Sequence, residues 1–275
     1  MSESPEERAF RALTDKITRA RGICCDAYKD RCLKRRIAVR MRARGVHNFD
    51  DYSRVLDGDV REYDLLLDAL TINVTKFYRN PETWIALAPY LAERWRAHAG
   101  ALTAWSAGCA SGEESYTIAV ALAETARTTH TAGWLSRARI IATDIDRVSL
   151  ERAQAARYPE SAFSEMPTDL IDRYIEPAAG DGTRTPRAAV RELVSVRRHD
   201  LTHQRPPAGP FDLVVCRNVV IYFDRRLQER LFRVFAEVLR PEGLLVLGKV
   251  ETLLGAAREL LRIEDTRERI YRRPG

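Results

Sequence analysis

The chain has 275 residues, of which 45% are hydrophobic and 31% are charged, a composition typical of a globular protein with one large domain or two. Its net charge of +6 favours an acidic partner only if the basic residues cluster. Because no apolar run approaches the ~18 residues of a membrane span or forms a secretory signal, and the five cysteines form no CxxC pair, we expect a cytoplasmic protein without membrane insertion, disulfide framework or metal centre.

Residues 1–70 carry helical periodicity and no clear strand. Within them, the segment 29–45 places Leu33, Ile37 and Met41 four residues apart, on one face of a helix. Its other positions hold eight Lys or Arg residues against one acid. The sequence leaves two alternatives open, a solvated helix face or a docking surface for an acidic partner. The candidate partner-binding residues are Arg31, Lys34, Arg35, Arg36, Arg40, Arg42 and Arg44.

A polar and aromatic segment over residues 70–81 breaks the helical period before a predicted helix over 82–96. Asn73, Thr75 and Arg79 alternate along this segment and can line a pocket. Composition alone favours the other interpretation, an interhelical loop in which Arg79 is exposed.

An apolar run over 102–105 leads into a loop of small residues and then a helical pattern, which predicts the start of a βαβ unit. Gly108 lets the backbone of this loop approach a ligand. Glu113 and Glu114 in the first helical turn would repel a phosphate, so a dinucleotide fingerprint is not expected. An acid at this point suits a cationic nucleoside such as S-adenosylmethionine. The alternative is an ordinary turn whose acids complement the helix dipole.

A second strand is predicted over 138–144, with Asp144 at its end. In a doubly wound sheet this position is well placed to hold ribose hydroxyls. Asp146 is better placed as the cap of the following helix, which leaves Asp144 for the ligand.

Residues 157–198 interrupt the βαβ pattern and predict an inserted subdomain with short strands over 189–193 and 194–198. The segment 211–216 is a clear buried strand, and an amphipathic helix is expected over 226–239. The remaining predictions are a short helix near 169–174 and strands over 244–247, 260–263 and 269–272. Together these elements predict a mixed three-layer α/β sheet with an antiparallel end.

Four segments resemble the chemotaxis-receptor methyltransferases, the CheR family. They are NVTKFYR at 73–79, SAGCASGEESY at 106–116, ATDID at 142–146 and CRNVVIYFD at 216–224. The resemblance spans roughly residues 10–272, and the four segments together are highly specific.

The resemblance implies an all-α N-terminal domain followed by a Rossmann-like class I methyltransferase domain with a small inserted β-subdomain. We expect the first domain over residues 1–86, the second over 87–275 and the insert over about 157–198. The residues that it implies as S-adenosylmethionine contacts are Asn73, Thr75, Arg79, Glu113, Asp144, Asn218 and Val219. Asp200 and Leu201 occupy the family's Asn-Leu pair beside the adenine, and the change to Asp is a departure from the pattern.

By the same resemblance, the substrate is a glutamate on the cytoplasmic domain of a methyl-accepting chemoreceptor, and the products are a glutamate methyl ester and S-adenosylhomocysteine. A glutamate with an ordinary pKa of about 4.3 is already ionised near neutral pH, so no general base is required. We hypothesise that Arg79 orients a carboxylate and that Tyr222 positions the methyl group or the glutamate. Tyr222 as a packed aromatic residue is the alternative.

Two other functions stay open at this stage. One is methylation of RNA or a small molecule, although the chain lacks a basic stripe interleaved with aromatic residues, so no nucleic acid is expected. The other is a regulatory module that binds S-adenosylmethionine without turnover.

Overall fold

The computed structural model describes residues 4–21, 24–70 and 75–275. Its internal contacts divide the chain into two compact units, residues 1–73 with 222–227 and residues 74–221 with 228–275. Residue 86, where we expected the domain boundary, falls inside a helix of the second unit.

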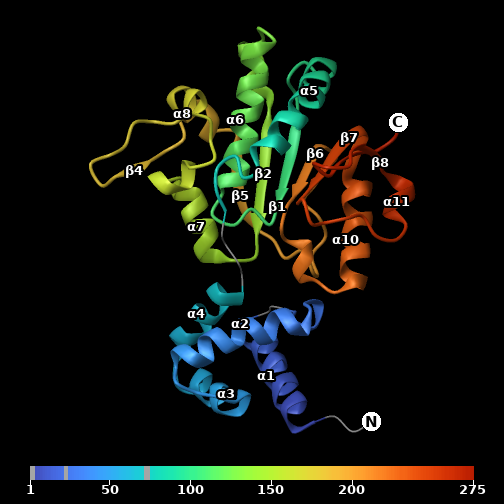
Figure 1. Cartoon of the computed structure of the whole chain (residues 1–275). Helices are drawn as coiled ribbons and strands as arrows, with labels where there is room; N and C mark the ends of the chain where they lie inside the picture. Colours follow the sequence, from blue (N-terminus) through green and yellow to red (C-terminus); the bar gives the residue numbers. More distant parts are fainter. Residues whose placement is uncertain (1–3, 22–23, 71–74) are drawn as a thin grey trace. The chain divides into compact units, whose positions relative to one another are not determined.

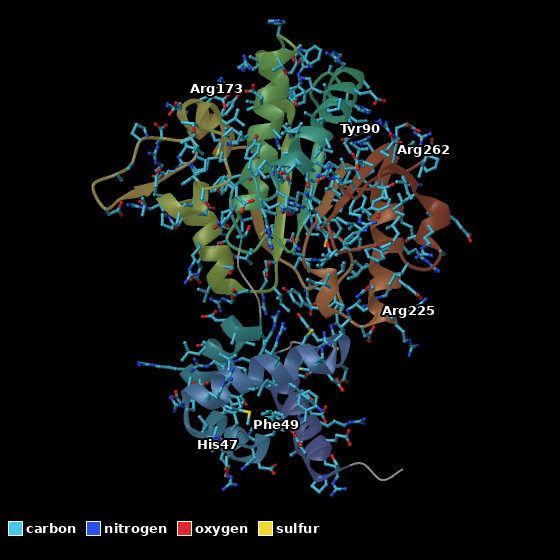
Figure 2. All side chains as sticks on the ribbon, in the orientation of Figure 1. His47, Phe49, Tyr90, Arg173, Arg225 and Arg262 are labelled. Carbon is cyan, nitrogen blue, oxygen red and sulfur yellow. The ribbon has the colours of Figure 1, made fainter. Side chains whose placement is uncertain are left out.

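The first unit is helical, as predicted. Its helices are α1 (Pro5–Arg21), α2 (Asp30–Ala43), α3 (Phe49–Gly58) and α4 (Val60–Leu70), with a short 3-10 turn η1 (Cys25–Ala27). The rings of Phe10 and Phe49 lie 5.3 Å apart and bring α1 against α3 (Figure 2, where Phe49 is labelled). Leu33 and Ile37 of α2 are buried, so the apolar stripe of the sequence forms the core face of this helix.

A buried carboxylate ties three of these helices together. Glu62 of α4 is fully buried and accepts two hydrogen bonds of 2.9 Å from Arg40 of α2 and one of 2.8 Å from the hydroxyl of Tyr52 on α3. A buried charge is tolerated when it is paired and hydrogen-bonded, as here. Part of the basic character of α2 is therefore used inside the unit.

The second unit is built on a seven-stranded sheet with the strand order β5-β2-β1-β6-β7-β9-β8, within the residues described. The strands are β1 (Thr103–Ala107), β2 (Arg139–Asp144), β5 (Val194–Arg198), β6 (Phe211–Cys216), β7 (Leu239–Leu247), β8 (Arg262–Asp265) and β9 (Ile270–Arg272). The first five in spatial order are parallel, and β9 pairs antiparallel with both β7 and β8. The predicted mixed sheet with an antiparallel end is confirmed.

Helices cover both faces of this sheet. The helices and 3-10 turns are α5 (Pro81–Ala97), α6 (Glu113–Thr128), η2 (Ala132–Arg137), α7 (Arg147–Ala155), η3 (Glu160–Phe163), α8 (Thr168–Tyr174), α9 (Ala188–Arg191), η4 (Val220–Tyr222), α10 (Arg225–Val238) and α11 (Ala257–Leu260).

Side chains alternate across a strand, so Ala104 of β1 joins the core formed with α5 and α6. Its neighbour Trp105 lies 5.5 Å from the ring of Phe235 on α10. The result is the predicted three-layer arrangement (Figure 1).

The region 157–198 differs from the prediction. The strand expected over 189–193 was wrong, because this segment forms the short helix α9, on which Val190 is buried. The strand expected over 194–198 exists as β5, but it joins the edge of the main sheet parallel to β2. The separate β-structure in this region is one short antiparallel pair, β3 (Tyr158–Pro159) with β4 (Thr183–Arg184).

Candidate active site

The loop that follows β1 is hydrogen-bonded to the carboxyl end of β2. The amides of Gly108 and Cys109 both donate to the carbonyl oxygen of Thr143, at 2.8 and 2.9 Å. The carboxylate of Asp144 accepts from the amides of Ala110 at 2.8 Å and Asp146 at 3.0 Å. Burial raises the pKa of Asp144 above its ordinary value. Asp144 therefore lies at the strand end where a ribose was expected, and it also fixes the preceding loop.

Asp146 caps α7, as predicted. Its carboxylate accepts from the amides of Val148 at 3.0 Å and Ser149 at 3.3 Å. The two aspartates of the ATDID segment thus have separate structural tasks.

Gly108 packs directly against the loop that follows β6. Its φ is +81°, and a Cβ added to it would lie 2.5 Å from Cγ2 of Val219. A side chain there is strained by the positive φ and requires Val219 or the backbone beside it to shift. The structure brings these two predicted cofactor residues together, and it gives Gly108 a packing role in addition to the predicted ligand approach.

The two glutamates at the start of α6 have different neighbours, but burial raises the pKa of both. Glu113 is 6% exposed and accepts 2.7 Å from the hydroxyl of Ser111. Glu114 accepts 2.9 Å from the hydroxyl of Ser106. Burial raises the pKa of each to about 7, because neither has enough compensating positive charge. A cationic ligand supplies that charge, so the pair suits an ammonium or sulfonium group.

Two arginines supply positive charge around Glu114. Arg217 is 6% exposed, and it donates 2.8 Å to the side-chain oxygen of Asn80. Burial lowers the pKa of Arg217, while the charge of Glu114 raises it. The charge of Arg79 acts on both Glu114 and Arg217, so Arg79 belongs to this cluster.

Asn218 combines an unusual backbone with an unsatisfied side chain. Its φ is +60°, in the left-handed region that Asn tolerates better than most residues. Within the described part of the chain, its buried Oδ1 has no hydrogen-bond partner. A buried amide oxygen is normally satisfied, so a ligand that donates a hydrogen bond here removes an energetic cost.

The polar segment that begins at Thr75 is hydrogen-bonded to other parts of the second unit. The amide of Phe77 donates to the carbonyl oxygen of Ala162 at 3.0 Å, and the amide of Tyr78 donates to the hydroxyl of Thr117 at 3.0 Å. Asn73 lies outside the described residues, so its predicted contact stays a prediction.

Asp200 and Leu201 follow β5, on the far side of β2 from β1. The carboxylate of Asp200 accepts from the amide of Thr202 at 2.7 Å and from its hydroxyl at 2.6 Å. Leu201 lines a cavity of about 240 Å³ together with Trp105 and other residues. Asp200 and Leu201 therefore lie beyond the carboxyl end of β5, one strand away from Asp144.

Comparison with known proteins identifies the family. The family model "CheR methyltransferase, all-alpha domain" matches residues 8–71, and "CheR methyltransferase, SAM binding domain" matches residues 73–270. The chain belongs to the CheR family. A "Chemotaxis protein methyltransferase" of Klebsiella aerogenes is 33% identical over 257 residues, covering 91% of this chain and 85% of that protein.

Two further relatives carry the same description. One, from Escherichia coli, is 31% identical and covers 88% of this chain and 83% of its own length. Another, from Listeria monocytogenes, is 32% identical, with coverages of 91% and 92%. The predicted family, fold class and cofactor are thus confirmed: the chain is an S-adenosylmethionine-dependent methyltransferase of chemotaxis signalling. No helix in the described ranges combines the length and apolar character needed to cross a bilayer.

Tyr222, the predicted catalytic tyrosine of this CheR-family chain, belongs to the first compact unit. Its carbonyl oxygen accepts 2.9 Å from the amide of Lys29, and the guanidinium of Arg36 lies 4.3 Å from the centre of its ring. The catalytic role of Tyr222 stays a prediction.

The predicted partner-binding residues of α2 fall into two groups. Arg31, Arg35 and Arg42 are exposed and, at 100° per residue, lie within one narrow face of the helix. The others make contacts inside the unit: Arg36 donates to the carbonyl oxygen of Leu70, Lys34 lies 4.8 Å from the ring centre of Phe10, Arg40 pairs with Glu62, and Arg44 pairs with Asp59 at 3.2 Å. Only the first group offers a fully exposed basic face.

Sequence reasoning named Glu114 beside Glu113 but missed two other charged residues of the site. Arg217 lies inside a segment that carried the CheR resemblance, so its position was available but its burial was not. Glu251 lies outside those segments, and its carboxylate binds the loop of Asn218. Nothing in the local sequence around Glu251 signals this contact.

Proposed function

We propose that this enzyme transfers the methyl group of S-adenosylmethionine to glutamate side chains on the cytoplasmic domains of chemoreceptors, forming glutamate methyl esters. The observation that carries the proposal is the cluster of Glu114 with Arg217 and Arg79 in the chain of a CheR-family enzyme, with the buried Glu113 one position before Glu114 on the helix. The carboxylates offer a negative subsite and the arginines a positive one. Such substrates place the enzyme in the cytoplasm.

The residues present fit the cofactor. When bound, S-adenosylmethionine supplies an activated methyl group on a positively charged sulfur. Glu113 and Glu114 balance its positive charge, because their burial leaves them short of a cation. The free Oδ1 of Asn218 accepts a hydrogen bond, Asp144 accepts from the ribose, and Asp200 accepts from the adenine amino group.

The chemistry asks little of the protein beyond alignment and exclusion of water. The acceptor glutamate is ionised near neutral pH, so no side chain has to remove a proton. Arg79, beside the buried Arg217, holds the acceptor carboxylate in line with the methyl group. Tyr222 positions the acceptor, and Tyr222→Phe is expected to lower turnover with cofactor affinity unchanged.

The exposed face of Arg31, Arg35 and Arg42 on α2 is the proposed docking surface for an acidic receptor helix. Three positive charges on one face attract an acidic surface at long range, and salt weakens the attraction. Arg36, Arg40 and the other engaged residues of α2 are proposed to hold this helix in place.

The deciding experiment incubates the protein with methyl-labelled S-adenosylmethionine and purified receptor cytoplasmic fragments. Label that is released by mild base identifies an ester and supports the proposal. Base-stable label contradicts the proposal and supports a different acceptor. Cofactor binding without label also contradicts it and supports a non-catalytic module.

A matched pair of variants tests the docking face. Arg35→Glu is expected to raise the KM for the receptor fragment, more strongly at low salt. The control is Arg54→Glu on α3, which makes the same charge change at an exposed arginine paired only with the partly exposed Asp51 at 2.7 Å. Equal effects of the two variants would refute a specific role for α2.

A further inference from the structure

Glu251 is a buried carboxylate that no part of the proposed chemistry uses. It is 2% exposed and lies 33 positions after Asn218, in the loop that follows β7. Its Oε2 accepts from the amides of Asn218 at 3.0 Å and Gly248 at 2.6 Å. Its Oε1 accepts from the amides of Val219 at 3.0 Å and Ile221 at 3.4 Å. One side chain thus satisfies four backbone donors from two loops.

The carboxylate of Glu251 supports the loop after β6 by accepting hydrogen bonds from three of its backbone amides. Asn218 is in the left-handed conformation, and the amides of Val219 and Ile221 lie at the start of the short turn η4. Unpaired buried amides are costly, so the carboxylate determines which conformation of the loop is stable. Burial raises the pKa of Glu251, and the amide hydrogen bonds oppose that rise.

The fit of Gly248 shows how closely the two loops approach. A Cβ on Gly248 would lie 2.7 Å from Oε2 of Glu251 and 2.9 Å from the amide nitrogen of Asn218. The contact continues to the loop after β1, since Val219 covers Gly108. A shift of the Asn218 loop therefore disturbs both sides of the proposed cofactor site.

We propose that Glu251 is a positioning residue for cofactor binding: its carboxylate holds Asn218 and Val219 in the conformation that contacts S-adenosylmethionine. The inference rests on the proposed contacts of these two residues with the cofactor. Both oxygens of Glu251 act as acceptors for two amides each, so an amide side chain of the same shape does not substitute. Gln would direct its NH₂ group at two N–H donors.

The test measures the affinity of the full chain for S-adenosylhomocysteine by calorimetry. Glu251→Gln is expected to raise Kd at least tenfold, roughly 1.4 kcal/mol at 25 °C. Glu251→Asp keeps two acceptors but shortens their reach, so a smaller increase is expected. In turnover assays the KM for S-adenosylmethionine should rise more than kcat falls, a split that general destabilisation does not produce.

The matched control is Asp212→Asn. Asp212 is 1% exposed and lies at the amino end of β6, where its carboxylate accepts from the amide of Thr103 at 3.0 Å and pairs with Arg94 at 2.9 Å. It is a buried carboxylate of the same unit at the opposite end of the strand from the Asn218 loop, so the Kd of this variant should stay within twofold of the wild type. Gly248→Ala places a Cβ against the carboxylate of Glu251 and the amide of Asn218, so it is expected to weaken binding like Glu251→Gln.

The outcomes separate this inference from the proposed function. Folded Glu251→Gln and Gly248→Ala proteins that bind within twofold of the wild type overturn the role of Glu251. If Glu251→Gln does not fold, Gly248→Ala and Glu251→Asp decide in the same way. Weak binding by Glu251→Gln together with normal binding by Asn218→Ala and Val219→Ala removes the proposed cofactor contacts instead.

Discussion

Lowering the pH from about 7 to about 6 is expected to weaken binding of S-adenosylhomocysteine, whose ammonium group stays charged in this range. Glu113 and Glu114 each have a pKa raised by burial to about 7. Each is therefore half protonated at about pH 7 and ~90% protonated at about pH 6. A ligand cation favours the ionised form, so binding at the lower pH has to release protons.

The magnitude follows from the fraction of each carboxyl group that is ionised. If the bound state requires one ionised carboxylate, Kd rises about fivefold over this interval, and about 30-fold if it requires both. The stability of the cofactor-free protein changes in the opposite direction. Because the folded pKa of about 7 lies above the ordinary 4.5, the contribution of these groups to stability is largest below pH 4.5 and is lost as the pH rises through 7.

Calorimetry at the two pH values, in two buffers of different ionisation enthalpy, measures both Kd and the number of protons released. Glu114→Gln should remove one titrating group and flatten the dependence, and Glu113→Gln isolates the other. A Kd that is constant between about pH 6 and about pH 7, with no proton release, would refute the assignment of these acids to the cofactor cation.

Three other changes test separate parts of the molecule. Gly108→Ala places a Cβ against Val219 and should lower both the cofactor affinity and the stability of the protein, the stability by about 1–3 kcal/mol. Calorimetry and thermal unfolding measure these effects, and the control is Gly133→Ala, where an added Cβ has no neighbour within 4 Å. Arg79→Ala should reduce methylation at least tenfold in a protein with an unchanged circular dichroism spectrum, and wild-type turnover would remove its role. Glu62→Gln removes the charge that accepts hydrogen bonds from the partly exposed Arg40 and should destabilise the first unit by about 2 kcal/mol with cofactor affinity unchanged, as measured by urea unfolding and calorimetry.

The parallel strands β2 and β6 were predictable because each contains a short apolar run rich in branched residues. The strand predicted over 211–216 coincides with β6, and that over 138–144 with β2 to within one residue. The prediction for 189–193 failed because a five-residue segment with one alanine, one valine and one leucine is compatible with a helical turn as well as with a strand.

The site was predictable where function is tied to a fixed position in the chain. Asp144 at a strand end and Glu113 at a helix start could be located from the sequence alone. Glu251 could not, because its role comes from a contact 33 residues away. Arg36 is similar: it borders the apolar stripe of α2, and whether it is exposed depends on the carbonyl of Leu70 and the ring of Tyr222.

The charge arrangement of the site agrees with the reaction that we propose for it. Transfer of a methyl group from a sulfonium to a carboxylate removes one positive and one negative charge, so the acidic subsite keeps only the ammonium group of the product and the arginines face an uncharged ester. Glu114 and Arg217 partly compensate each other's charge before the reactants bind, although burial still penalises both ionised forms. The reactants therefore stabilise the buried charges of the site more than the products do. This difference favours binding of the reactants and release of the products.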